Sequence, residues 1–142
     1  MPNRLDLQNL SQTRLHEAEV LFDAGLFDGS FYLCGYVVEL AMKACVCRHL
    51  GVEEYPESEP NLKGLFRTHD FRSLELVAGL RSSVSAKRQA SLTFDDNWTL
   101  ATSWKPEDRY LLNSKNQNEA HDMLEAVRSA PEGVLTWLSQ QW

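Results

Sequence analysis

The stretch that decides the fold is residues 30–50, SFYLCGYVVELAMKACVCRHL, in which apolar side chains fall on almost every side of a helix. A helix without a polar face is normally the buried centre of a bundle, because other elements must cover all of it. Gly35, Ala41 and Ala44 would let neighbouring helices approach closely, and Gly51 is well placed to end the helix. We therefore expect this stretch to form the central helix of the fold.

Before the central stretch, residues 7–22 place apolar side chains at spacings of three and four, which is the period of a helix. This pattern predicts a first helix that begins near Asn3 or Asp6 and ends before Gly25. Residues 27–30, FDGS, are expected to form a short connection to the central helix.

After the central stretch, residues 52–66, VEEYPESEPNLKGLF, contain two prolines, one glycine and four acids, and they predict a long exposed connection. Asp70 or Thr68 can then cap a third helix. Residues 82–92 indicate an extra short helix, whereas residues 95–106, DDNWTLATSWKP, predict an aromatic-rich loop.

A last helical region begins near Asn116 or Asn118. We expect it to be kinked or divided near Pro131, because proline removes a helical hydrogen bond. Ser129 and Glu132 match the Ser-x-x-Glu capping box of a helix that restarts.

These helices predict the fold class. The sequence shows no strand pattern and no internal repeat, and 43% of its residues are hydrophobic and 24% charged, as in ordinary globular proteins. A chain of 142 residues is close to the commonest size of a single domain. We therefore expect one all-α domain over residues 1–142, folded as an up-and-down antiparallel four-helix bundle.

Charge and cysteine content limit the partners and the compartment. The net charge of −6 argues against broad binding to DNA or to an anionic membrane. Residues 61–90 differ, since six bases and two acids give this segment +4 and leave −10 for the remainder, which makes it a possible anion site. Three cysteines in one apolar stretch, with no signal-peptide pattern at the N-terminus, predict a cytoplasmic protein without disulfides.

The order of these features resembles the HEPN domain family of prokaryotes and higher eukaryotes. The resemblance extends from about Leu7 to Leu138, and its most specific pieces are GYVVELAMKA at residues 35–44, Thr68-His69-Asp70-Phe71 and Arg109-Tyr110. It implies a helical bundle that usually dimerises and is often encoded beside a minimal nucleotidyltransferase. Members are RNA-cleaving toxins and defence nucleases, or non-catalytic modules that bind nucleotides or partner proteins.

The nuclease members of the family carry Arg, four to six residues, and then His. None of the four histidines of this chain follows an arginine at that spacing. Metal-independent RNA cleavage needs a base and a cationic phosphate stabiliser placed together, so the departure argues against ribonuclease activity.

Arg67, His69 and Asp70 form the sharpest candidate cluster. A helix N-terminus offers unpaired amides to an anion, Arg67 adds positive charge, and His69 titrates near neutral pH, so the cluster could hold a phosphate. The alternative is that Asp70 or Thr68 only caps the helix and that His69 hydrogen-bonds to the backbone.

A second candidate group could form an aromatic and cationic wall on which a base stacks. It consists of Trp98, Trp104, Arg109 and Tyr110. The alternative is that the aromatic residues close the core while Arg109 pairs with Glu107 or Asp108.

Other residue groups give little support for catalysis. Cys45, Cys47 and His49 do not share one helix face, so we expect no metal there. Glu39 and Lys43 are expected to form an intrahelical ion pair, with a dimer cleft as the alternative. No standard enzyme motif or cofactor motif is present.

Together with the missing nuclease motif, the resemblance implies a dimeric HEPN-like binding or regulatory module of a prokaryote, in a setting like that of toxin–antitoxin pairs. Its partners would be a nucleotide or RNA ligand, or a nucleotidyltransferase. One alternative is an endoribonuclease toxin with a divergent site, such as Arg67 and His69 with Arg109. Another is a structural homodimer without a ligand.

Overall fold

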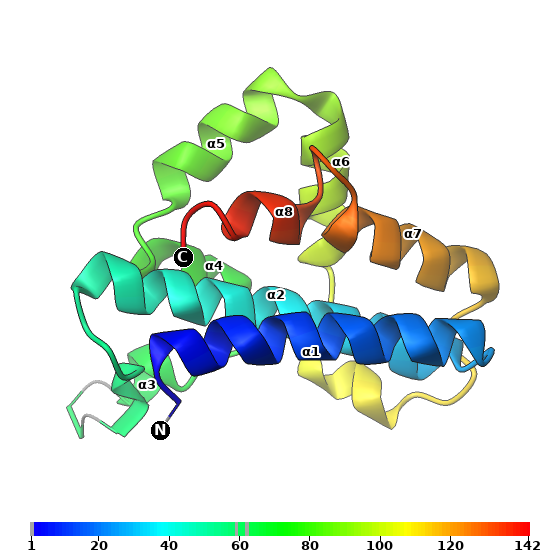
Figure 1. Ribbon diagram of the computed structural model, residues 1–142, viewed down its shortest axis with the longest axis horizontal. Helices are drawn as coiled ribbons and strands as arrows, with labels where there is room; N and C mark the ends of the chain where they lie inside the picture. Colours follow the sequence, from blue (N-terminus) through cyan, green and yellow to red (C-terminus); the bar gives the residue numbers. More distant parts are fainter. Residues whose placement is uncertain (1, 59, 62) are drawn as a thin grey trace.

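The structure, a computed structural model, describes residues 2–58, 60–61 and 63–142. Within these residues the chain is helical, with one isolated antiparallel bridge between Asn3 and Glu54 and no β-strand, which confirms the all-α class. In chain order (Figure 1) the elements are α1 (Arg4–Asp23), α2 (Phe27–Leu50), η1 (Pro56–Ser58), α3 (Lys63–Phe66), α4 (Phe71–Val77), α5 (Arg81–Ala90), α6 (Leu92–Ala101), η2 (Pro106–Tyr110), α7 (Gln117–Arg128) and α8 (Val134–Leu138).

Helices α1 and α2 form an antiparallel pair that runs the length of the molecule (Figure 1). The Asn3 side chain caps α1 by accepting from the backbone N–H of Asp6 at 2.8 Å, and Gly25 turns the chain at φ +77°. The predicted connection at residues 27–30 is wrong, because these residues form the first turn of α2. Asp28 in this turn accepts from the backbone N–H of Lys115 at 2.8 Å and so fastens the segment before α7.

Helix α2 is the buried centre of the fold. Among the described helices it is the one that is long and apolar enough to cross a membrane by length and composition, and 78% of its most apolar window is buried inside the protein. Helices α1, α4, α6, α7 and α8 all contact it. The other helices therefore supply the cover that its apolar surface requires.

Gly35 sets the closest approach to α2. A β-carbon at this position would lie 2.0 Å from Cγ of Trp104, so the indole ring rests directly on the helix backbone. Tyr32, Tyr36 and Phe71 surround the ring at centroid distances of 5.4, 6.3 and 5.8 Å. This packing pins the segment between α6 and η2 onto α2.

The predicted exposed connection over residues 52–66 is wrong in part. It contains η1 and α3, and residues 59 and 62 lie outside the described residues. Tyr55 is 1% exposed, and its hydroxyl donates to the carbonyl of Phe66 at 2.8 Å. The Tyr55 ring thus anchors this segment to the core.

The region between Asp70 and residue 104 is more helical than predicted. Asp70 caps α4 as expected, and α5 corresponds to the expected short helix near 82–92. The predicted loop at 95–106 is largely α6, which Ser91 caps by accepting from the backbone N–H of Phe94 at 3.1 Å. Apolar residues four and three positions apart bury one face of α6, and these are Phe94, Trp98 and Ala101.

The last helical region divides as expected, but not through the predicted capping box. Ser129 is the C-terminal cap of α7, and Gly133 precedes α8 without a side-chain cap. Glu132 instead accepts from the hydroxyl of Ser91 at 2.5 Å and pairs with Nζ of Lys87 at 3.3 Å. The turn between α7 and α8 is therefore tied to the corner between α5 and α6.

Replacing Gly35 by alanine tests the contact between Trp104 and α2. The added methyl group would force the indole ring off the helix, so we expect Gly35→Ala to lower the free energy of unfolding by about 1–3 kcal/mol, as overpacked cores do. Urea denaturation measures the change. Gly64→Ala is the matched control, since nothing lies within 4 Å of its added β-carbon. Equal stability of the two variants would contradict the contact.

Candidate functional site

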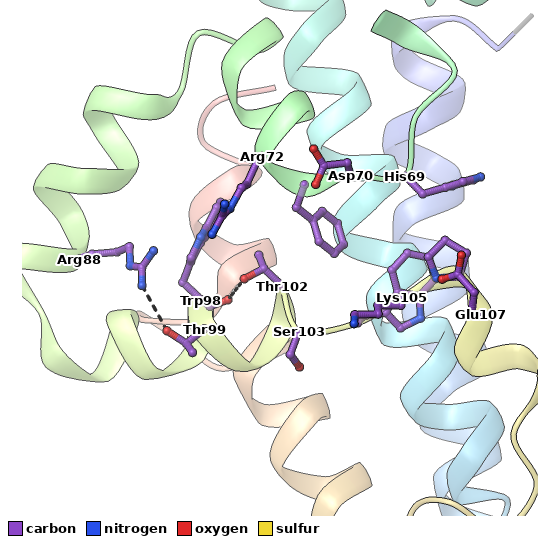
Figure 2. Close-up of a pocket in the computed structure, with 13 residues that line it drawn as sticks. His69, Asp70, Arg72, Arg88, Trp98, Thr99, Thr102, Ser103, Lys105 and Glu107 are labelled. Atoms are coloured by element: carbon purple, nitrogen blue, oxygen red, sulfur yellow. Dashed lines mark hydrogen bonds between the residues drawn. The ribbon is translucent and has the colours of Figure 1, made fainter. Parts of the chain in front are cut away.

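One cleft, here called the His69 cleft, has a volume of about 590 Å³. It lies where the start of α4, the end of α5, α6 and the segment before η2 meet (Figure 2). Its lining residues are His69, Asp70, Phe71, Arg72, Arg88, Trp98, Thr99, Thr102, Ser103, Trp104, Lys105, Pro106 and Glu107.

The cleft has a buried aromatic floor and a polar rim. Phe71, Trp98 and Trp104 are buried, whereas Arg72 and Lys105 are exposed. In the described part of the chain, the indole Nε1 of Trp104 is buried and has no hydrogen-bond partner. Such a donor is costly unless an acceptor approaches it.

Some charges of the cleft are already engaged by neighbouring groups. The guanidinium of Arg88 pairs with the carboxylate of Asp95 at 2.5 Å and donates to the hydroxyl of Thr99 at 3.2 Å. Asp70 accepts from the hydroxyl of Ser73 at 2.6 Å. This hydrogen bond is the main reason that the pKa of Asp70 is lowered.

Three rim charges are not engaged. Among the described residues, no ion pair within 4.0 Å involves Arg72, Lys105 or Glu107. Arg72 and Lys105 face two carboxylates of the lining, Asp70 and Glu107, so these four groups carry no net charge, and Arg88 is offset by Asp95. An anion that enters the cleft would meet Arg72 and Lys105 as its cationic partners.

A buried carboxylate outside the cleft lining holds one of the lining side chains in place. Glu39 on α2 is 1% exposed, and its Oε1 lies 2.9 Å from Nζ of Lys43. Its Oε2 lies 2.8 Å from Nδ1 of His69, whose side chain is 52% exposed. The intrahelical pair expected for Glu39 and Lys43 is thus confirmed, and it is extended to a third group that lies 30 positions away in sequence.

This contact orients the imidazole. A carboxylate only accepts hydrogen bonds, so Nδ1 of His69 is the donor in its contact with Glu39. Nε2 of His69 is then the ring nitrogen that remains for a ligand.

The first predicted cluster is only partly assembled. His69 and Asp70 line the cleft, whereas Arg67 does not and its Nε lies 3.6 Å from Glu57. Asp70 caps α4, as the alternative interpretation held, but His69 contacts the side chain of Glu39 instead of the backbone.

The predicted aromatic wall does not form around the cleft. Trp104 lines it from a buried position, but Arg109 and Tyr110 are outside its lining. Arg109 lies 4.8 Å from the centroid of the Tyr110 ring and donates to its hydroxyl at 3.0 Å, and Tyr110 is 75% exposed. The alternative pairing of Arg109 with Glu107 or Asp108 is not found among the described ion pairs.

The cysteines do not contribute a reactive site. Cys34, Cys45 and Cys47 are free thiols and all are buried. Burial raises the pKa of Cys34 and of Cys45 to about 12, so both stay protonated at neutral pH. Among the described residues, no group of three or more His, Cys, Asp or Glu side chains could hold a metal ion.

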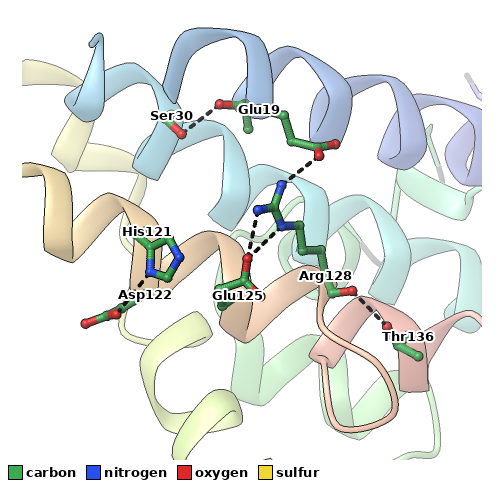
Figure 3. Close-up of polar contacts among 8 residues, drawn as sticks. Glu19, Ser30, His121, Asp122, Glu125, Arg128 and Thr136 are labelled. Carbon is green, nitrogen blue, oxygen red and sulfur yellow. Dashed lines mark hydrogen bonds and ion pairs between the residues drawn. The ribbon is translucent and has the colours of Figure 1, made fainter. Parts of the chain in front are cut away.

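A second polar cluster, on α7, has a structural role (Figure 3). The guanidinium of Arg128 lies 2.7 Å from Glu19 on α1 and 2.8 Å from Glu125. Arg128 thereby ties α7 to α1. His121 lies about two turns before Arg128 on α7, beside Asp122 at 3.6 Å, and does not contact Arg128 (Figure 3).

Sequence reasoning missed most of the rim. Arg72 and Arg88 lie in the basic segment that the charge count singled out, so composition contained a signal for them. Thr99, Ser103 and Lys105 fall within residues 95–106, which the sequence predicted to be a loop. Without a predicted helix, the directions of these side chains could not be inferred.

Comparison with known proteins found no matching family model, no matching curated protein and no matching solved structure.

Replacing Glu39 by glutamine tests the buried network. The amide keeps the shape but has only one accepting oxygen for Lys43 and His69, so we expect Glu39→Gln to cost about 1–3 kcal/mol of unfolding free energy. Glu125→Gln, which weakens an exposed pair with Arg128, should cost less than about 1 kcal/mol. Urea denaturation compares the two variants.

A second readout follows the imidazole itself. Nitrogen NMR of His69 should show the proton on Nδ1 in the wild type and a loss of this preference in Glu39→Gln. Equal costs in the two variants together with an unchanged His69 spectrum would contradict the network.

Proposed function

We propose that the chain is a HEPN-like helical binding module and that the His69 cleft holds its ligand, an anion of the nucleotide class. The observation that carries this proposal is the pair of rim cations, Arg72 and Lys105, neither of which forms an ion pair within 4.0 Å in the described part of the chain.

The HEPN-like topology is part of the proposal. Its four helices would be α1, α2, α4 and α7, with α8 as the restart of the last one. The antiparallel pair of α1 and α2, and the packing of α4 and α7 against α2, support this arrangement.

We also propose that the module works as a homodimer in the cytoplasm of a prokaryote, with a minimal nucleotidyltransferase as its partner in a toxin–antitoxin-like setting. The family resemblance of residues 35–44 and 68–71 supports this. Light scattering that returns the mass of a single 16.2 kDa chain would contradict the homodimer. Failure of the product of a neighbouring nucleotidyltransferase gene to copurify would contradict the partner.

Calorimetric titration with AMP tests the ligand site. We expect the double variant Arg72→Ala, Lys105→Ala to weaken binding at least about tenfold, because it removes both free cations. Arg67→Ala is the matched control, since Arg67 lies outside the cleft and should leave affinity unchanged. A flat titration of the wild type would favour the ligand-free structural homodimer.

An endoribonuclease is the second candidate, and the contact of Glu39 with His69 favours it. A histidine oriented by a buried carboxylate beside cations can act as a general base near a phosphate. Arg67 and Arg109, considered with His69 from the sequence, do not line the cleft, so Arg72 and Lys105 would replace them as phosphate stabilisers.

Incubation with total RNA in the presence of a chelator separates the two functions. A binding module leaves RNA intact, and this is the result we expect. Cleavage that persists in Arg67→Ala and is lost in His69→Ala would replace binding with catalysis as the function.

A further inference from the structure

The cleft also limits which part of a ligand it can recognise. Resting on the function proposed above, we infer that the His69 cleft recognises the phosphate and the sugar of its ligand and not the base, so that its ligand class is phosphorylated sugars, with or without a base.

The rim cations supply the phosphate subsite. Arg72 comes from α4 and Lys105 from the segment before η2, and both are exposed (Figure 2). The planar guanidinium of Arg72 can bind two phosphate oxygens, and the ammonium of Lys105 adds a compact positive charge.

The hydroxyl groups of the cleft are left as acceptors. Thr99 donates to the carbonyl of Asp95 at 2.9 Å, Thr102 to that of Trp98 at 2.7 Å, and Ser103 to that of Leu100 at 2.6 Å. A hydroxyl has one proton and two lone pairs, so while these bonds are kept each group accepts and does not donate, and Thr99 already accepts from Arg88 at 3.2 Å.

These accepting hydroxyls determine which chemical group of the ligand can lie beside its phosphate. Hydroxyls that only accept cannot stabilise an anion, and the free carboxylate of Glu107 on the same rim accepts as well. A ligand must therefore bring donors to this side of the cleft. The hydroxyl groups of a sugar next to the phosphate meet that need.

The cleft lacks a platform for a base. Stacking requires an open aromatic face, whereas Phe71, Trp98 and Trp104 are 6%, 2% and 3% exposed. The rings of Phe71 and Trp104 pack against each other, and Trp104 also packs against Gly35 of α2. The ring of Trp98 packs against those of Phe94 and Trp137. Tyr110 does expose its ring, but it does not line the cleft.

Calorimetry with four probes tests the inference. We expect ribose 5-phosphate, AMP and UMP to bind with affinities within about threefold of one another, and adenosine at least about tenfold more weakly, because the phosphate supplies the charge. AMP binding without ribose 5-phosphate binding would overturn the inference and leave the proposed nucleotide site standing. Adenosine that binds as tightly as AMP would overturn both the inference and the proposed anion site. No binding by any probe would overturn the proposed function itself.

Ser103→Ala tests the sugar side. Removing this acceptor should weaken the binding of ribose 5-phosphate several-fold and leave the affinity for inorganic phosphate unchanged, since inorganic phosphate brings no sugar hydroxyl. Ser83→Ala on the exposed surface of α5, outside the cleft, is the matched control. An equal loss of affinity for ribose 5-phosphate and for inorganic phosphate would contradict a sugar subsite at Ser103.

Discussion

The buried carboxylate of Glu39 is the constraint that determines where the imidazole of the candidate site lies. A charge buried on an otherwise apolar helix must be paired, and Lys43 one turn later satisfies only one of its oxygens. The other oxygen draws in His69 from the segment before α4. The cost of burying one acidic group is thus offset by a contact that places an imidazole at the edge of the cleft.

The apolar surface of α2 shapes the rest of the molecule. Because the helix has no polar side, α1 covers one face and α4, α6, α7 and α8 cover the others. Gly35 lets the indole of Trp104 reach the backbone, which brings the segment after α6 close to the start of α4. The cleft is the space between elements that are held to the same helix.

The sequence predicted those features that depend on local signals. Asn3, Gly25 and Asp70 mark helix ends through caps and turns that neighbouring residues determine. Helix α6 was missed because Asp95 and the polar residues beside it resemble a turn, and packing against the core overrides that preference. The partner of His69 lies 30 positions away and could not be inferred from spacing. The cleft rim likewise joins residues from separate elements.

The burial of every cysteine makes the chain convenient for site-specific chemistry. Protonated thiols inside the core react slowly with maleimides and with oxidants. A single cysteine introduced at an exposed position, such as Leu92, would be the one fast-reacting thiol of the protein. A fluorophore or spin label could then be attached there without first removing the native cysteines.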